Sequence, residues 1–300
     1  MAPSFPFVLN VAAGPHPIAA TSADAISAIV HGVVQAGEID WLCSGKAFDI
    51  GFAGDPDSVR AALRDIDHEW LLDINVLAGA KRRKGLLVAD MDSTIIGCEC
   101  IDELADMAGI KPKVAAITER AMRGEIDFPV ALRERVSLLK GLPLENLTRV
   151  YADRVRLNPG ARALTATMRA HGAHTLLVSG GFSFFTSRVA AAAGFEESHG
   201  NRLLDDGKHL TGKVAEPILG REAKLQALES SVQRLGIAFG DSLAVGDGAN
   251  DLDMIRRAGL GVAFHAKPVV AAAAQCSITH GDLTSLLYLQ GYRGDEILKE

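Results

Sequence analysis

Cysteines, aromatic residues and long hydrophobic runs are scarce in this 300-residue sequence. It contains four cysteines and 5% aromatic residues. Cys98 and Cys100 lie close together, but two thiolates without two further clustered ligands do not make a zinc site, so we expect free, reduced thiols. No run reaches the ~18 apolar residues that a membrane span needs, and no positively charged segment precedes an apolar one at the N-terminus. These absences predict a cytoplasmic protein without a membrane partner.

Positive charge is also scarce. Lysine and arginine number 31 against 37 acidic residues, and the net charge is −6. One short cationic cluster, Lys81–Lys84, is too small for a nucleic-acid surface, so no nucleic-acid partner is predicted. We expect this cluster to be an exposed linker before a buried strand. The motifs GxxxxGK[ST] and GxGxxG are absent, so the usual nucleoside triphosphate and dinucleotide sites are not predicted.

The first 80 residues have the pattern of a small α+β domain. We expect the order β-α-β-β-α-β, with Ser22 as the N-cap of the first helix and a hairpin turn at Gly45–Lys46. The expected elements are strands at 6–12, 39–44, 47–54 and 70–79, a helix at 22–35 and a second helix that begins near Asp55 or Pro56 and runs through residue 67. This order resembles that of ACT-like and ferredoxin-like small domains, which bind amino acids or pair subunits. The resemblance implies a regulatory or dimerising domain at 1–80 and a homodimer formed through it.

From residue 85 to 300, short apolar runs alternate with helical segments. This alternation predicts an α/β fold with a Rossmann-like parallel sheet covered on both faces. The expected strands are 85–90, 174–180, 242–247, 260–264 and 276–279, and an all-helical insert at about 98–154 separates the first two. Ligands bind at the carboxyl ends of such strands, where Asp90, Ser179–Gly180 and Asp247 stand. We therefore expect these residues to form one site.

The stretch "DMDST" places Asp90 and Asp92 directly after a buried strand. A calcium loop is excluded, because Ile95 and Ile101 stand where that loop needs glycine and glutamate. A helix cap explains part of the pattern, since Asp, Ser and Thr are good N-caps. The alternative is catalytic: the first carboxylate would attack a phosphate, and the second would handle the proton of the leaving group.

Two further segments bring polar groups to the same sheet edge. In "VSGG", Ser179 and Gly180 offer a hydroxyl and a bare amide to a phosphate oxygen, although an ordinary glycine turn would look the same. In "VGDGANDLDM", Asp247 and Asp251 add two carboxylates. Four acids in one cleft favour Mg²⁺ over zinc. Lys224 would supply further positive charge, although a single helical lysine is usually solvated.

One arginine stands where an apolar residue is expected. Leu132, Val136 and Leu139 form a stripe at helical spacing, and Arg135 falls inside it. An arginine at the edge of a stripe can extend its head to water. A buried arginine that binds a carboxylate would have the same position, and local sequence does not decide between these interpretations.

The stretches "DMDST", "VSGG", a downstream lysine and "GDGAND", in this order, resemble the haloacid dehalogenase-like phosphohydrolases. The insert segment "ITERAMRGEIDFPVALRERVSLLKGLP" and the segment "AVGDGANDLDMIRRAGLGVAFHAKP" resemble the branch of that family that hydrolyses phosphoserine. The likeness extends over about residues 86 to 290. The phenylalanine that many relatives carry near the first motif is absent at Ala89 and Met91, which are packing positions.

The resemblance implies Mg²⁺-dependent hydrolysis of O-phospho-L-serine, the last step of L-serine biosynthesis, through an aspartyl-phosphate. Asp90 would be the nucleophile and Asp92 the general acid and base. Mg²⁺ would be held by the Asp90 carboxylate, the Asp92 main-chain carbonyl and Asp247, with Asp251 and Asn250 supporting it. The remaining implied contacts are with the phosphoryl group (Ser179, Gly180, Lys224 and Asn250) and with the seryl group, made by the helical cap (Glu99, Arg135, Phe128 and Met122).

Two other functions remain open at this point. The same chemistry could act on another small phosphorylated metabolite or transfer the phosphoryl group to an alcohol. A non-catalytic amino-acid sensor using residues 1–80 is the third interpretation, but it has no need for four mutually repelling carboxylates.

Overall fold

Four antiparallel strands near the start of the chain form the first sheet. The computed structural model describes residues 5–64 and 66–299. The strand order is β2-β3-β1-β4. The strands are β1 (Phe7–Ala13), β2 (Gln35–Cys43), β3 (Ala47–Ala53) and β4 (Leu72–Ala78), and the helices are α1 (Ala20–Val33), α2 (Pro56–Ala62) and α3 (Ile66–Trp70). The expected element order is therefore present.

Two local expectations in this unit are corrected. Helix α1 begins at Ala20 rather than after Ser22, because the Ala19 carbonyl already accepts hydrogen bonds from the amides of Ser22 and Ala23. The second expected helix begins at Pro56, as predicted, with the side chain of Asp55 as its cap, but it is divided into α2 and α3. Residues 1–4 and 65, which fell in the predicted domain and helix, lie outside the described residues.

The second sheet has six parallel strands in the order β12-β11-β10-β5-β6-β7. This confirms the predicted α/β class. The strands are β5 (Leu86–Ala89), β6 (His174–Phe182), β7 (Glu197–Asn201), β10 (Ser242–Gly246), β11 (Leu260–Phe264) and β12 (Cys276–Ile278). Strand β7, whose sequence has few apolar residues, was not anticipated.

Helices cover both faces of this sheet, as its alternating side chains require. Leu87 and Ala89 of β5 pack with α8 and α9, whereas Leu86 and Val88 pack with α10 and α11. The helices of this part are α8 (Ala161–Ala170), α9 (Ser183–Ala193), α10 (Arg221–Leu235), α11 (Leu252–Arg257), α12 (Pro268–Ala271) and α13 (Ser285–Leu289). Within the described part of the chain, no helix is long and apolar enough to span a bilayer.

Four helices between β5 and α8 form a separate lobe, which we call the cap. They are α4 (Cys100–Met107), α5 (Lys111–Met122), α6 (Phe128–Ser137) and α7 (Glu145–Arg154). A later hairpin, β8 (Leu203–Asp205) and β9 (Leu210–Val214), extends this lobe. The amides of Gly141 and Leu144 donate to the carbonyls of Leu210 and Lys208, at 2.8 and 2.9 Å. The cap is thus not built from the helical insert alone.

The connection between the two sheets is only in part the exposed linker that the cationic cluster suggested: Lys81 and Arg83 are exposed, but Arg82 is not. The Arg82 guanidinium pairs with Asp49 and donates to the carbonyls of Tyr288 and Leu289, at 2.8 and 2.9 Å, and its side chain is only 11% exposed. Burial of this arginine is tolerated because a carboxylate and two carbonyls satisfy it.

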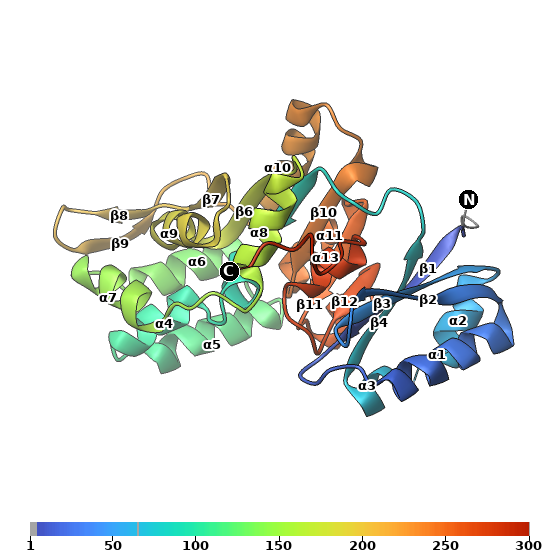
Figure 1. Ribbon diagram of the computed structural model, residues 1–300. Helices are drawn as coiled ribbons and strands as arrows, with labels where there is room; N and C mark the ends of the chain where they lie inside the picture. The colour runs from blue at the N-terminus through green and yellow to red at the C-terminus, as the bar shows by residue number, and fades with distance from the viewer. Residues whose placement is uncertain (1–4, 65, 300) are drawn as a thin grey trace.

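The first sheet is docked on edge strand β12 through polar side chains. The Asp73 carboxylate accepts hydrogen bonds from the amides of Thr279, His280 and Gly281, at 2.7, 3.0 and 2.8 Å. The Asn75 side chain pairs with both the amide and the carbonyl of Ser277. This contact covers one edge of the parallel sheet, and the cap lies on the opposite side of that sheet (Figure 1).

Candidate active site

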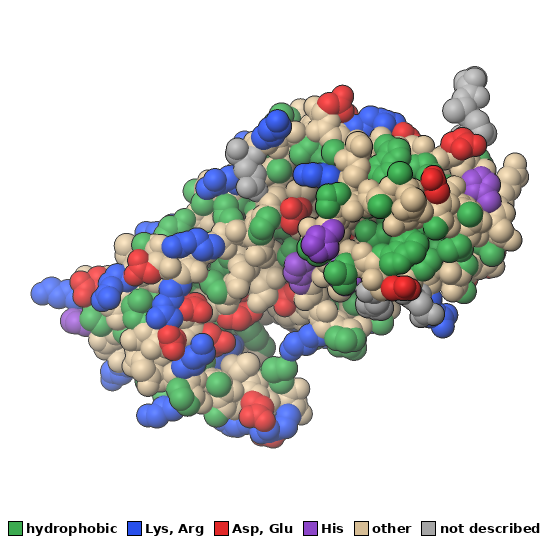
Figure 2. Space-filling view, turned by 60° about the horizontal axis from the view of Figure 1, so that its bottom comes forward, with side chains coloured by type: hydrophobic (Ala, Val, Ile, Leu, Met, Phe, Trp, Pro, Cys, Tyr) green, Lys and Arg blue, Asp and Glu red, His purple; other side chains and the backbone are tan. Residues whose placement is uncertain are grey.

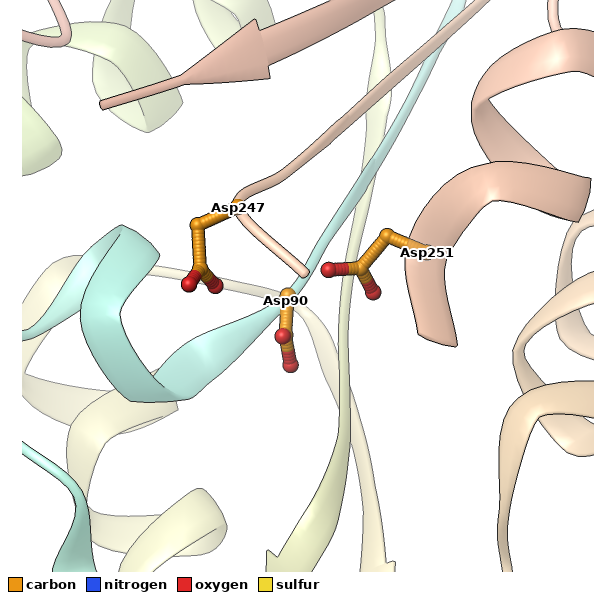
Figure 3. Close-up of side chains that lie close together, drawn as sticks. All are labelled: Asp90, Asp247 and Asp251. Atoms are coloured by element: carbon orange, nitrogen blue, oxygen red, sulfur yellow. The ribbon is translucent and has the colours of Figure 1, made fainter. Parts of the chain in front are cut away.

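The first carboxylate of the predicted site, Asp90, is placed by the pairing of two parallel strands. The amide of Asp90, directly after β5, donates to the carbonyl of Val245 in β10 at 3.0 Å. Asp247 directly follows β10, and Asp251 lies in the next turn (Ala249–Asp251). Carboxylate oxygens of Asp90, Asp247 and Asp251 all lie within 4.8 Å of one another, and Figure 3 shows them converging. The predicted meeting of Asp90 and Asp247 at one sheet edge is therefore present.

A tight turn returns the second carboxylate to the same edge. The turn Met91–Ile95 contains Ser93 in the left-handed region, with φ at 58°. Asp92 accepts a hydrogen bond from the Cys100 amide at 2.9 Å and one from the Ser179 hydroxyl at 3.1 Å. Cys100 is the first residue of α4, and Ser179 lies in β6. The two hydrogen bonds of Asp92 therefore connect the turn after β5 to the cap and to β6.

Lys224 is buried between two of these acids. Its ammonium lies 2.7 Å from Asp90 Oδ1 and 2.6 Å from Asp251 Oδ1, and the residue is 1% exposed. The second Asp251 oxygen accepts from the Gly248 amide at 3.0 Å. The structure therefore excludes the ordinary solvated lysine that the local sequence left open.

The last part of β6, which continues to Phe182 rather than ending at the expected residue 180, approaches the acids closely, and this explains its glycines. Ser179 is 1% exposed, and its hydroxyl accepts from the Gly181 amide at 2.8 Å. A Cβ on Gly181 would lie 2.7 Å from Asp92 Oδ2, and one on Gly180 would lie 3.0 Å from the ring of Phe128. Side chains at either position would push away the carboxylate or the cap.

Burial raises the pKa values of Asp90, Asp92 and Asp247, and repulsion from Asp251 adds to the shift at Asp90 and Asp247. The pKa of Asp90 lies well above its usual range, chiefly because of burial and then because of Asp251, with Lys224 opposing both. Burial also raises the pKa of Asp92, and burial and Asp251 raise that of Asp247 to about 6. Carboxylates held this way are stabilised in their charged form by a hard cation, and a donor set of oxygen atoms alone fits Mg²⁺.

Two cap residues of opposite charge, Glu99 and Arg135, interact electrostatically without forming an ion pair with each other, and Glu99 also interacts with Asp92. Glu99, directly before α4, accepts from the Ser93 hydroxyl at 2.8 Å, and burial followed by Asp92 raises its pKa to about 7. Arg135 on α6 bonds only weakly, to the Ala131 carbonyl at 3.3 Å and to the Thr118 hydroxyl at 3.5 Å. It forms no ion pair within residues 5–64 and 66–299, so guanidinium donors are left for a ligand.

The other residues expected from the sequence lie in different settings. Phe128 packs its ring against Gly180 of β6 and Gly220, the residue before α10. Met122, at the end of α5, is 67% exposed, and Asn250 is exposed beside Gly248. Their binding roles stay predictions. Figure 2 shows a hollow on the side of the molecule where the cap lies, with acidic side chains at its rim.

Two buried polar residues near the acids were missed in the sequence. Thr94 is fully buried and its hydroxyl donates to Asp247 Oδ1 at 3.4 Å. Thr94 belongs to the "DMDST" stretch, so its closeness to Asp90 and Asp92 in the sequence could have identified it as a site residue. Asn201 is 2% exposed and bonds to the backbone beside Ser179. It lies in a polar edge strand that offers no such signal.

Comparisons with known proteins agree with this geometry. The model of the haloacid dehalogenase-like hydrolases matches residues 87–256. The phosphoserine phosphatase of Archaeoglobus fulgidus is 44% identical over 234 residues, which cover 77% of this chain and 68% of that protein. The phosphoserine phosphatase of a Polaromonas species is 47% identical over 209 residues, covering 68% of this chain and 89% of that protein.

A solved structure resembles nearly the whole chain. It is a haloacid dehalogenase family hydrolase from Salmonella enterica serovar Typhi, with a TM-score of 0.83 and 28% identity. The match covers 94% of this chain and 97% of that one, so it includes the first sheet. With a family model that matches more than half of its residues and relatives 44% and 47% identical to it, the chain belongs to the haloacid dehalogenase-like hydrolases.

Proposed function

We propose that this protein hydrolyses O-phospho-L-serine to L-serine and phosphate, the last step of L-serine biosynthesis. One observation carries the proposal: two cap residues offer opposite charges, Glu99, whose pKa is raised by burial and Asp92, and Arg135, which interacts electrostatically with Glu99. An α-amino acid presents an ammonium and a carboxylate that complement this pair. The identity to phosphoserine phosphatases of two organisms supports the same substrate.

The phosphoryl end would bind where three donors meet. These are the Lys224 ammonium, which contacts the carboxylate of Asp90, the Ser179 hydroxyl, which contacts Asp92, and the Gly180 amide beside Ser179; Asp90 itself is 5% exposed. Positive charge and a bare amide in a site with little water stabilise the negative oxygens of a phosphoryl group in transfer. Phe128 would exclude water from this side of the substrate.

In the first step, an Asp90 oxygen attacks phosphorus and the bond from phosphorus to the seryl oxygen breaks. The leaving oxygen takes a proton from Asp92, so L-serine departs neutral at its hydroxyl. Burial raises the pKa of Asp92 and helps it carry that proton. In the second step, Asp92 takes a proton from water as the water oxygen attacks phosphorus, and the bond from phosphorus to Asp90 breaks.

We also propose Mg²⁺ as the cofactor, held by the Asp90 carboxylate, the Asp92 main-chain carbonyl and Asp247. Asp251 supports this arrangement from the Lys224 side. The cation would supply positive charge that keeps the acids ionised and offsets the charge of the phosphoryl group. The convergence of three carboxylates supports this choice.

The proposal extends to the organisation of the whole chain. Residues 1–80 would form a regulatory or dimerising domain in a homodimer, and residues 85–300 the phosphatase. The first sheet has a hydrophobic core of its own, which supports this division. A cytoplasmic location stays a prediction from composition.

A substrate panel tests the function. Phosphate release is measured with phosphoserine, phosphothreonine and p-nitrophenyl phosphate, with and without Mg²⁺. Two charged contacts to the seryl group predict a kcat/KM at least ~100-fold higher for phosphoserine than for the aryl phosphate. Equal values would contradict the substrate, and addition of homoserine as an acceptor distinguishes transfer from hydrolysis.

A further inference from the structure

Asn201, the last residue of β7, connects two segments that carry phosphate-binding groups. Its side-chain Nδ2 donates to the Gly180 carbonyl at 2.8 Å and to the Leu219 carbonyl at 3.0 Å. Its Oδ1 accepts from the Leu219 amide at 2.8 Å. The residue is 2% exposed, so these bonds are shielded from water.

The two segments hold different halves of the phosphate site. Gly180 directly follows Ser179, whose hydroxyl contacts Asp92. Leu219 directly precedes Gly220, and the Gly220 carbonyl accepts from the amide of Lys224 in the first turn of α10. A single amide side chain thus links the hydroxyl and the bare amide on one side to the ammonium on the other.

The cap rests on the same two segments. The ring of Phe128 lies 3.0 Å from the place of a Cβ on Gly180 and 3.1 Å from that of a Cβ on Gly220. Movement of either segment would therefore shift both the floor of the phosphate site and the seat of the cap.

The chemistry of the link requires an amide. Two carbonyls need two N–H donors and one backbone N–H needs an acceptor, and the carboxamide of asparagine offers all three in one plane. An aspartate of the same shape keeps the acceptor but sets a carboxylate against two carbonyl oxygens.

We propose that Asn201 is a positioning residue for phosphoryl transfer. It fixes the spacing between the Ser179–Gly180 segment and Lys224 without touching the substrate itself. This inference rests on the proposed phosphoryl chemistry, but not on phosphoserine as the substrate.

The test compares Asn201→Ala and Asn201→Asp with Asn75→Ala as a matched control. Asn75 is also buried, at 6% exposure, and its amide pairs with the backbone of Ser277 at 3.0 and 2.8 Å, far from the site in the contact with the first sheet. All variants are assayed as full-length protein with Mg²⁺ and p-nitrophenyl phosphate, a substrate without a seryl group. The readouts are kcat, KM, the Ki of inorganic phosphate, the Mg²⁺ concentration for half-maximal activity and Tm.

Both Asn201 variants should lose ~100-fold in kcat/KM, since displacement of a positioned group by about 1 Å costs this much. The Ki of inorganic phosphate should rise about tenfold, and the Mg²⁺ concentration for half-maximal activity should stay within about twofold. Asn75→Ala should lower Tm while kcat/KM and the phosphate Ki remain those of the wild type.

Asn201→Asp preserves the size of the side chain and the hydrogen bond from the Leu219 amide. This variant is used for the test if the alanine variant does not fold. The proposal is overturned if a folded Asn201 variant keeps kcat/KM and the phosphate Ki within about twofold of wild type. It is also overturned if Asn75→Ala changes both constants equally, because the effect would then be general destabilisation. A wild type that does not prefer phosphoserine would contradict the proposed substrate and leave this comparison intact.

Discussion

Replacement of Asp247 by asparagine should stabilise the protein when no divalent cation is present. Burial, followed by repulsion from Asp251, raises the pKa of Asp247 from 3.8 to about 6. A carboxyl group with a raised pKa binds its proton more tightly in the folded state than in the unfolded chain. The charged form of this residue therefore opposes folding at neutral pH.

The size of the effect follows from the pKa. A shift of roughly 2 units corresponds to ~3 kcal/mol at 1.36 kcal/mol per unit, and partial exposure of Asp247 reduces this to about 1–2 kcal/mol. Between about pH 4 and 6 the unfolded carboxyl has lost its proton while the folded one retains it. The free energy of unfolding should thus fall as pH rises through this window and remain lowered above it.

Urea unfolding in EDTA from pH 4 to 8 measures this directly. At pH 7, Asp247→Asn should be about 1–2 kcal/mol more stable than wild type, and the difference should vanish near pH 4. Addition of Mg²⁺ should stabilise the wild type and have little effect on the variant.

Asp253→Asn is the matched control, since Arg221 lowers the pKa of that carboxyl and the same substitution should destabilise. The electrostatic argument is wrong if Asp247→Asn is less stable than wild type at pH 7 in EDTA. It is also wrong if Mg²⁺ raises the free energy of unfolding of the variant as much as that of the wild type.

Three further substitutions test other parts of the account. Lys224→Met leaves Asp90 and Asp251 buried without their counter-ion and should cost about 3–5 kcal/mol in urea unfolding; a loss below about 1 kcal/mol would contradict the buried pair. Arg135→Lys should lower kcat/KM for phosphoserine at least ~10-fold and leave p-nitrophenyl phosphate unchanged, whereas equal losses would place the residue outside the seryl site. Asp73→Ala leaves three amides unpaired and should lower the free energy of unfolding by about 2–4 kcal/mol, and unchanged stability would show that the contact with β12 contributes nothing.

The position of the acids could be predicted because parallel strands have a fixed polarity. Three apolar runs lead to Asp90, Ser179 and Asp247. Because parallel strands have their carboxyl ends on the same side of the sheet, neighbouring strands place these residues together. The sequence pattern identified those strands correctly, since they are short, apolar and separated by helices.

Elements held by polar contacts could not be predicted in the same way. Strand β7 (Glu197–Asn201) and the hairpin that extends the cap have no apolar period, and backbone hydrogen bonds to β6 and to the cap place them. Arg82 is buried only because Asp49, distant in sequence, meets it. A local pattern cannot show a partner that the fold supplies.

The roles of Lys224 and Arg135 also could not be decided from the local sequence. Each has an ordinary surface interpretation in its own helix. The first is excluded by two carboxylates at 2.7 and 2.6 Å from its ammonium, and the second is left with unused donors near Glu99.

The central claim is that Asp90 receives the phosphoryl group of phosphoserine. Rapid acid quench of a single turnover with Mg²⁺, followed by mass spectrometry of proteolytic peptides, tests it most directly. The account predicts a phosphoryl adduct on Asp90, and loss of both adduct and turnover in Asp90→Asn. Full turnover of phosphoserine by Asp90→Asn, or an adduct on another residue, would contradict it.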